Sequence, residues 1–269
     1  MKRGHTLFSP DSTYWKVNRE TLVALAAPRA VLMEIAHPLV AEAVFRHSNF
    51  RRKGLARLYR TAMAAARVTF GTPAQAEAAA RRIAGCHAPV SGALEENVGT
   101  YHHGHRYSAT DADLMFWVLA TLIDTNLRAY DFLVEPLSLE QKEEYYQEAR
   151  RLAALLEIPA SAVCPTYGDF ARYMEDMVHG STLHIGSAAQ TLREALFPRS
   201  IRGRAARLLS FIGIGMLPAN LRQAYGLDWN DRKQERLEKL ARMLRSWRGK
   251  LPDVLLVSPF ATVSEWRIR

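Results

Sequence analysis

One segment limits the fold of this chain more than any other, because residues 114–123 are apolar on almost every side of a helix. A helix without a polar face is stable only when other helices surround it. Thr110 and Asp113 stand at the spacing of a capping box, which places the helix start close to residue 111. We therefore predict a helix over 111–133 at the centre of a helical bundle.

Helix signals recur along the rest of the chain. Thr72, Ser138 and Thr166 are each followed three residues later by Gln or Asp, a spacing typical of helix starts. Alanine, leucine and arginine dominate, and the sequence has no βαβ alternation, Gly-rich phosphate loop or internal repeat. This pattern predicts an all-α fold, a single multi-helix globular bundle. The other predicted helices span residues 19–27, 29–36, 38–47, 54–69, 73–91, 139–156, 167–179, 187–197, 201–215, 218–225 and 231–249.

The net charge and the apolar runs limit the partners and the compartment. The 269 residues carry a formal net charge of +9, which favours anionic partners. The helix expected over 231–249 is basic and amphipathic, which is compatible with peripheral membrane contact. Its basic residues are not interleaved with aromatic ones, so nucleic acid is not expected as a partner. Two cysteines, no signal-peptide core and no apolar run of roughly 18 residues predict a cytoplasmic protein without a transmembrane segment.

The helix expected over 54–69 carries the first candidate site. Arg57, Arg60 and Thr61 share one of its faces, and small side chains fill most of residues 62–66. Guanidinium groups bind carboxylates well, including the propionates of a haem. A solvated helix face next to an alanine packing surface explains the same residues, so the pattern alone leaves both interpretations open.

His87 is the second candidate, near the end of the helix expected over 73–91. Pro89 lacks a backbone N–H, so we expect a kink near Gly85. The small neighbours leave room beside the imidazole, which is a suitable axial ligand for haem iron. A core histidine bonded to a backbone carbonyl is the alternative. Cys86 points about 100° away around the helix, and we interpret it as a small buried packing residue.

Glu34 and His37 form a third candidate pair, three residues apart and just before Pro38. A carboxylate and an imidazole at this spacing could bind a metal or share a proton. A turn between two helices, with His37 close to a helix end, explains them equally well.

A long loop over 92–109 carries His102, His103 and His105. No acidic or cysteine partner stands at a recognised ligand spacing, so we expect these histidines to be solvated. Asp111 and Asp113 follow the loop, and capping of the next helix explains both carboxylates.

Short motifs spread over roughly residues 15–265 resemble one family, the mpaB and latex-clearing (rubber) oxygenases. Their order and spacing carry the resemblance, more than any single motif does. The matching stretches are Arg19-Glu20-Thr21, Pro28 to Met33, His37-Pro38, His47 to Phe50, Arg57-Leu58-Tyr59-Arg60-Thr61, Thr69 to Thr72, His87 with Val90 and Gly92, Tyr107 to Asp111, Leu114 with Trp117-Val118, Leu217-Pro218, Leu221-Arg222 and Tyr225 to Leu227.

The resemblance implies an oxygenase-like, all-helical catalytic domain over 15–265, preceded by an N-terminal extension over 1–14. It implies a buried cofactor pocket that holds haem b, with His87 as the axial ligand of the iron. The implied activity is that of an oxidoreductase. It would oxygenate an apolar, isoprenoid-like small molecule with O₂, and an electron donor would be a further partner.

The resemblance also assigns roles to the candidate residues. Arg57, Arg60 and Thr61 would line the haem pocket, and the last two would act as catalytic hydrogen-bond donors. Glu34 and His37 would be the candidates for moving protons.

Two positions depart from the family pattern. Arg60 replaces a lysine that caps the iron in rubber oxygenases; a guanidinium stays protonated and cannot do so, so an open or water-filled sixth position is expected. Leu119 stands where many relatives carry a histidine after the Trp-Val pair. Two alternatives stay open: a haem-binding protein without turnover, and a non-haem metalloenzyme that uses Glu34, His37 and His87.

Overall fold

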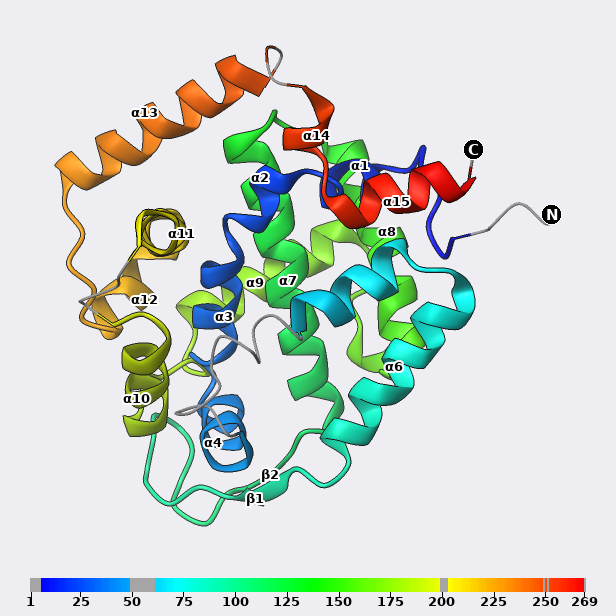
Figure 1. The fold of residues 1–269 in the computed structure, drawn as a ribbon. Helices are drawn as coiled ribbons and strands as arrows, with labels where there is room; N and C mark the ends of the chain where they lie inside the picture. The colour runs from blue at the N-terminus through cyan, green and yellow to red at the C-terminus, as the bar shows by residue number, and fades with distance from the viewer. Residues whose placement is uncertain (1–5, 49–60, 199–202, 249, 251, 269) are drawn as a thin grey trace.

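The computed structural model describes residues 6–48, 61–198, 203–248, 250 and 252–268. Within these residues the fold is helical apart from one antiparallel pair of short strands, which confirms the predicted all-α class. Figure 1 shows the helices gathered around the long helix α7 (Ala112–Leu133).

The elements follow one another with short connections. The bounds are α1 Thr13–Asn18, α2 Thr21–Ala24, α3 Ala27–Glu34, α4 Pro38–His47, α6 Pro73–His87, β1 Ser91–Ala93, β2 Arg106–Ser108, α8 Leu139–Leu155, η1 Ala160–Ala162, α9 Tyr167–His179, α10 Ser187–Leu196, α11 Arg204–Gly215, α12 Ala219–Ala224, α13 Asp231–Arg248, α14 Asp253–Leu256 and α15 Pro259–Ile268. Residues 61–70 are also helical and lead into α6.

Helix α7 is central, as its uniformly apolar sequence predicts. It packs against α1, α2, α3, α8, α9 and α13. Its first turn is capped by Asp111, whose carboxylate accepts the backbone N–H groups of Asp113 and Leu114. The cap is therefore Asp111 and not Thr110, one residue away from the position that the capping-box spacing indicates.

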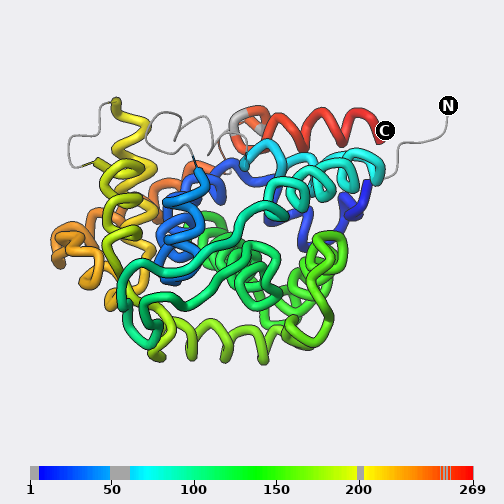
Figure 2. The backbone as a smooth tube through the Cα atoms, turned by 90° about the horizontal axis from the view of Figure 1, so that it is seen from below, coloured from blue at the N-terminus to red at the C-terminus, as the bar shows by residue number. Residues whose placement is uncertain are grey.

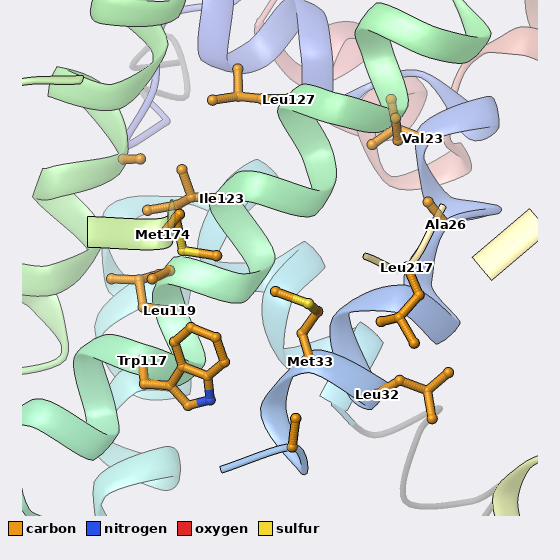
Figure 3. Close-up of a cluster of buried hydrophobic side chains, with 14 of the residues drawn as sticks. Val23, Ala26, Leu32, Met33, Trp117, Leu119, Ile123, Leu127, Met174 and Leu217 are labelled. Atoms are coloured by element: carbon orange, nitrogen blue, oxygen red, sulfur yellow. The ribbon is translucent and has the colours of Figure 1, made fainter. Parts of the chain in front are cut away.

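The core forms where α3 crosses α7. Figure 3 shows Trp117 and Ile123 of α7 with Met33 of α3 and Met174 of α9 in this cluster. All four side chains are buried. Helix α3 packs between α7 and α11, so its apolar residues have neighbours on two sides.

A buried ion pair ties these helices together. Arg29 of α3 donates from Nη2 to Asp124 Oδ2 at 2.5 Å and from Nη1 to Thr125 Oγ1 at 2.6 Å, both on α7. Its Nε donates to the carbonyl of Met216, just after α11. Each of the three guanidinium nitrogens therefore donates to an acceptor, which is what makes a fully buried cation tolerable.

The chain ends also join the core. Phe8 and Trp15 are fully buried, and the Trp15 indole N–H donates to Glu265 of α15 at 3.0 Å. Helices α1, α14 and α15 were not expected from the sequence. They are short, or lack a clear apolar stripe, and so give a weak periodic signal.

Within the described residues no single helix is long and apolar enough to cross a bilayer. Helices over 21–34 and 38–47 reach that composition only as a pair, and the pair is bent by 101°.

Candidate functional site

His87 is the last residue of α6. A capping box between Thr72 and Gln75, with Pro73 in the first turn, begins this helix. Ala88 is the C-cap, so the helix ends just before Pro89 and does not continue to residue 91. Pro89 has no backbone N–H to donate to the Gly85 carbonyl, so the helical hydrogen bonding stops there.

The last turns of α6 are open to solvent. Gly85 and Cys86 are exposed, whereas the His87 side chain is half-buried. A Cβ atom placed on Gly85 would meet no atom within 4 Å. The interpretation of Cys86 as a buried packing residue was therefore wrong, because its side of the helix faces solvent.

The helix over 61–70 presents small apolar side chains in the same open manner. Thr61, Ala62 and Ala65 are exposed, and the chain becomes buried only from Val68 onward. Arg57 and Arg60, the two cations predicted for this face, lie outside the described residues. The sequence suggested that these alanines form a packing surface. In the structure, Ala62 and Ala65 are exposed and do not pack in the core.

His37 caps the next helix of the site. Its Nδ1 accepts the backbone N–H of Leu39 at 3.3 Å, so the imidazole acts as the N-cap of α4. Its Nε2 lies 3.3 Å from the Tyr101 hydroxyl. With Nδ1 acting as an acceptor, Nε2 carries the proton and donates to Tyr101. Burial lowers the pKa of His37 to about 4, with the Asp111 carboxylate opposing that shift.

Glu34 is the last residue of α3, at the corner between α3 and α4. The carbonyl of Glu34 accepts the indole N–H of Trp117 at 3.3 Å and the backbone N–H of His37 at 3.3 Å. The residue is half-buried. The corner between α3 and α4 is thus fixed to α7 through Trp117.

The structure does not assemble Glu34, His37 and His87 into one metal site. Among the described residues no group of three or more His, Cys, Asp or Glu side chains is placed to hold an ion. Both ring nitrogens of His37 already have protein partners. The non-haem alternative therefore lacks the convergent ligand set that it needs.

A cavity of about 460 Å³, partly open to solvent and with polar and apolar residues in its wall, lies against the β-hairpin. It includes neither His87 nor Thr61 in its wall, but it reaches Ser91, four residues beyond His87. The residues that matter for its chemistry are His37, Tyr101, His105, Tyr107, Asp111 and Leu114.

Two tyrosines of this cavity were not expected from the sequence. Tyr101 bonds to His37, and burial raises its pKa. Tyr107 lies within 3.2 Å of His47 Nε2, and a Cβ on Gly92 would come within 2.5 Å of its hydroxyl. Gly92 therefore leaves room for Tyr107, whose ring crosses over it from the paired strand, and a larger residue there would displace the Tyr107 hydroxyl. The loop over 92–109 contains this hairpin, in which Gly92 pairs with Tyr107.

The loop histidines do not form a cluster of ligands. His102, His103 and His105 are exposed, in agreement with the solvated interpretation. The ring of His105 meets Tyr101 edge-on, with 5.1 Å between ring centroids, and His105 itself lies in the cavity wall.

Residues 15–246 match the family described as the ER-bound oxygenase mpaB/B′ and rubber oxygenase catalytic domain. The chain belongs to this oxygenase family. The match covers helices α2 to α12 and most of α13, so it contains His37, Thr61, His87 and the whole cavity. It ends before α14 and α15.

Two curated relatives share part of this family region. They are the uncharacterized proteins Mb2261 of Mycobacterium bovis and Rv2237 of Mycobacterium tuberculosis, each 28% identical over 145 residues. The matched segment spans 52% of this chain and 56% of each relative, so the comparison covers only about half of either protein. No solved structure matches the chain significantly.

Proposed function

We propose that this member of the oxygenase family is a haem b-dependent enzyme that oxygenates an apolar, isoprenoid-like small molecule with O₂. The observation that carries the proposal is His87, a half-buried imidazole at the end of a helix whose neighbouring face is open and lined by small residues. A cytoplasmic location and an electron donor as partner belong to the same proposal.

The end of α6 and the helix over 61–70 leave apolar surface that a large flat group would cover. Two residues before His87, on the other side of α6, a Cβ on Gly85 would meet no described atom of another element within 4 Å. The helix over 61–70 adds the exposed Ala62 and Ala65, and Figure 1 shows it and α6 diverging from the turn that joins them. Apolar faces that stay open in a folded protein commonly mark ligand sites.

The donor set also fits. A neutral imidazole is a common axial ligand of haem iron, and His87 is the residue that would hold it. Arg57, Arg60 and Thr61 would supply guanidinium and hydroxyl donors for the anionic groups of the same ligand. Haem, when bound, supplies the oxidative reactivity, and the protein supplies orientation and polarity.

His37 would serve the site as a positioning residue. Both of its nitrogens are engaged, and its pKa of about 4 keeps it neutral near pH 7. It therefore holds the Tyr101 hydroxyl at the cavity wall through a donated hydrogen bond. Glu34, whose side chain is half-buried beside the same corner, is the remaining candidate for proton transfer.

The test is a spectrum of the full chain titrated with haemin and then reduced with dithionite. We expect a Soret band that saturates at one haem per chain in the wild type and is lost in His87→Ala. His103→Ala is the matched control, since this exposed histidine is not part of the cavity wall. A His87→Ala protein with an unchanged haem spectrum would contradict the proposal.

Oxygen uptake separates an enzyme from a protein that only stores or senses haem. With the haem-loaded wild type and a panel of unsaturated terpenoids, we expect consumption of O₂ that depends on the terpenoid. A haem-loaded protein that consumes no O₂ with any member of the panel would support binding without turnover.

A further inference from the structure

The helix α15 has its apolar side facing solvent. Val263 and Trp266 expose 60% and 81% of their surface, and Phe260 on the same face is also exposed. Ala261 and Ser264 on the opposite face are buried against the protein. A surface helix normally places its polar residues outside, so this orientation leaves an apolar stripe without a partner in the described structure.

The end of α13 and helix α14 extend this apolar surface. Of the eight large hydrophobic side chains exposed in the described residues, six lie between residues 243 and 266. The three that precede α15 are Met243, Trp247 and Val254. In Figure 1, α13, α14 and α15 follow one another along the upper side of the molecule. The exposed apolar residues are therefore concentrated in one part of the chain.

Basic residues accompany the apolar ones. Helix α13 contains seven basic and three acidic residues. Some of its cations are paired, such as Arg248 with Glu20 and Lys233 with Asp228. Within the described part of the chain, no carboxylate lies within ion-pair distance of Lys239. This lysine stands one turn before Met243 on the same face of α13, so its charge is available to an external anion.

We infer that α13, α14 and α15 form a docking surface for an anionic lipid bilayer. Tryptophan is favoured at the membrane interface, where its ring reaches the acyl region and its N–H stays near the headgroups. Unpaired arginine and lysine next to such residues bind anionic headgroups. A second copy of the chain is the less suitable occupant, because it brings the same net charge of +9 to the contact.

The surface goes beyond the proposed activity and does not depend on haem. The family match ends at residue 246, so Trp247, α14 and α15 lie outside the region shared with the oxygenase family. Yet α15 contacts the turn before α6: Ser264 Oγ donates to the Phe70 carbonyl at 2.7 Å. Arg267 also donates to Gln75, in the first turn of α6. The docking surface is thus attached to the two helices that would hold the cofactor.

Flotation of the full chain with vesicles tests the inference. One set of vesicles is phosphatidylcholine alone, and the other is an equal mixture of phosphatidylcholine and phosphatidylglycerol. We expect the wild type to float with the anionic vesicles and to remain at the bottom with the neutral ones. Trp266→Ser should lower the bound fraction about tenfold, since a large interfacial side chain is lost.

Matched variants separate the surface from general effects of charge and polarity. Lys239→Glu should weaken binding to the anionic vesicles at least fivefold, the effect of about one charge near such a surface. Arg172→Glu reverses one charge on α9, which Figure 2 shows on the side of the molecule opposite α15. Leu139→Ser removes an equally exposed apolar residue at the start of α8. Both controls should bind like the wild type.

Depth of insertion gives a second readout. In Trp247→Phe the remaining exposed tryptophan is Trp266, because Trp15 and Trp117 are buried and Trp229 packs against the core. Its fluorescence should shift to the blue and be quenched by brominated acyl chains. Failure of the wild type to float with either vesicle, or equal binding by Trp266→Ser, would overturn the inference. So would a dimer in solution that Trp266→Ser dissociates while no vesicle is bound.

Discussion

The α3–α7 crossing and the pair formed by the helix over 61–70 and α6 show two different ways of placing apolar residues. At the crossing, Trp117, Ile123 and Met33 are buried, and the one cation among them, Arg29, has every nitrogen hydrogen-bonded. In the other region, alanine and glycine residues remain exposed on two successive helices. The side chains at the α3–α7 crossing are therefore packed and hydrogen-bonded by the protein alone. The helix over 61–70 and α6 have exposed apolar surface that a bound molecule would cover.

Breaking the ion pair should have the largest effect on stability. Arg29→Ala leaves Asp124 buried without its main partner, so we expect the free energy of unfolding to fall by about 3–5 kcal/mol. Urea denaturation of the haem-free protein measures this. Arg128→Ala is the control, since this exposed arginine also pairs with Asp124 but should cost less than about 1 kcal/mol. If the two variants lost equal amounts of unfolding free energy, the buried Arg29–Asp124 pair would not be what stabilises the α3–α7 crossing.

We expect haem to stabilise the region formed by the helix over 61–70 and α6, and not the α3–α7 crossing. At about 100 times its dissociation constant, a ligand that binds only the folded state adds about 2.7 kcal/mol to the free energy of unfolding. We expect this gain in the wild type and its loss in His87→Ala, measured by urea denaturation with and without haemin. A gain that survives in His87→Ala would place the ligand elsewhere.

We expect acid to lower the free energy of unfolding through His37, which lies in the wall of the cavity. The pKa of His37 is about 4 in the folded chain and near 6.5 when exposed, so the unfolded chain binds the extra proton between these values. This contribution to stability is therefore fully present above about pH 6.5 and declines as the pH falls toward 4.

The pH effect can be assigned to His37 with one variant. His37→Asn keeps an N-cap acceptor and removes the titrating group. Between pH 7 and pH 5, we expect the wild type to lose roughly 2 kcal/mol of unfolding free energy relative to this variant. Parallel stability curves for the two proteins would mean that another group dominates acid sensitivity.

A pair of glycine substitutions compares the two regions directly. Gly85→Ala should raise the stability of the haem-free protein by roughly 0.5–1 kcal/mol, because alanine favours the helix and the added Cβ meets open space. Gly213→Ala in α11 should lower it by about 1–3 kcal/mol, since the new Cβ would lie 2.6 Å from Pro28 Cβ. Thermal unfolding measures both changes. If both variants were stabilised, or both destabilised, the two regions would not differ in how tightly they pack.

The sequence by itself determined the central helix and the fold class. These depend on local rules: residues 114–123 allow no solvent-facing side, and capping residues begin a helix within a few positions of where they stand. Helix α6 was predicted over 73–91 with a kink near Gly85, but it ends at His87, so the predicted end was wrong. The family resemblance also needed only the order of motifs along the chain, and the match over residues 15–246 confirms it.

Only the tertiary structure decided what the polar residues do. His37 meets Tyr101 across 64 positions of sequence, and Arg29 meets Asp124 across 95. The side of α15 that faces solvent could not be foreseen either, because this helix is apolar around most of its circumference. Periodicity describes which residues share a face within one helix, but packing between distant helices determines which face is covered and which group finds a partner.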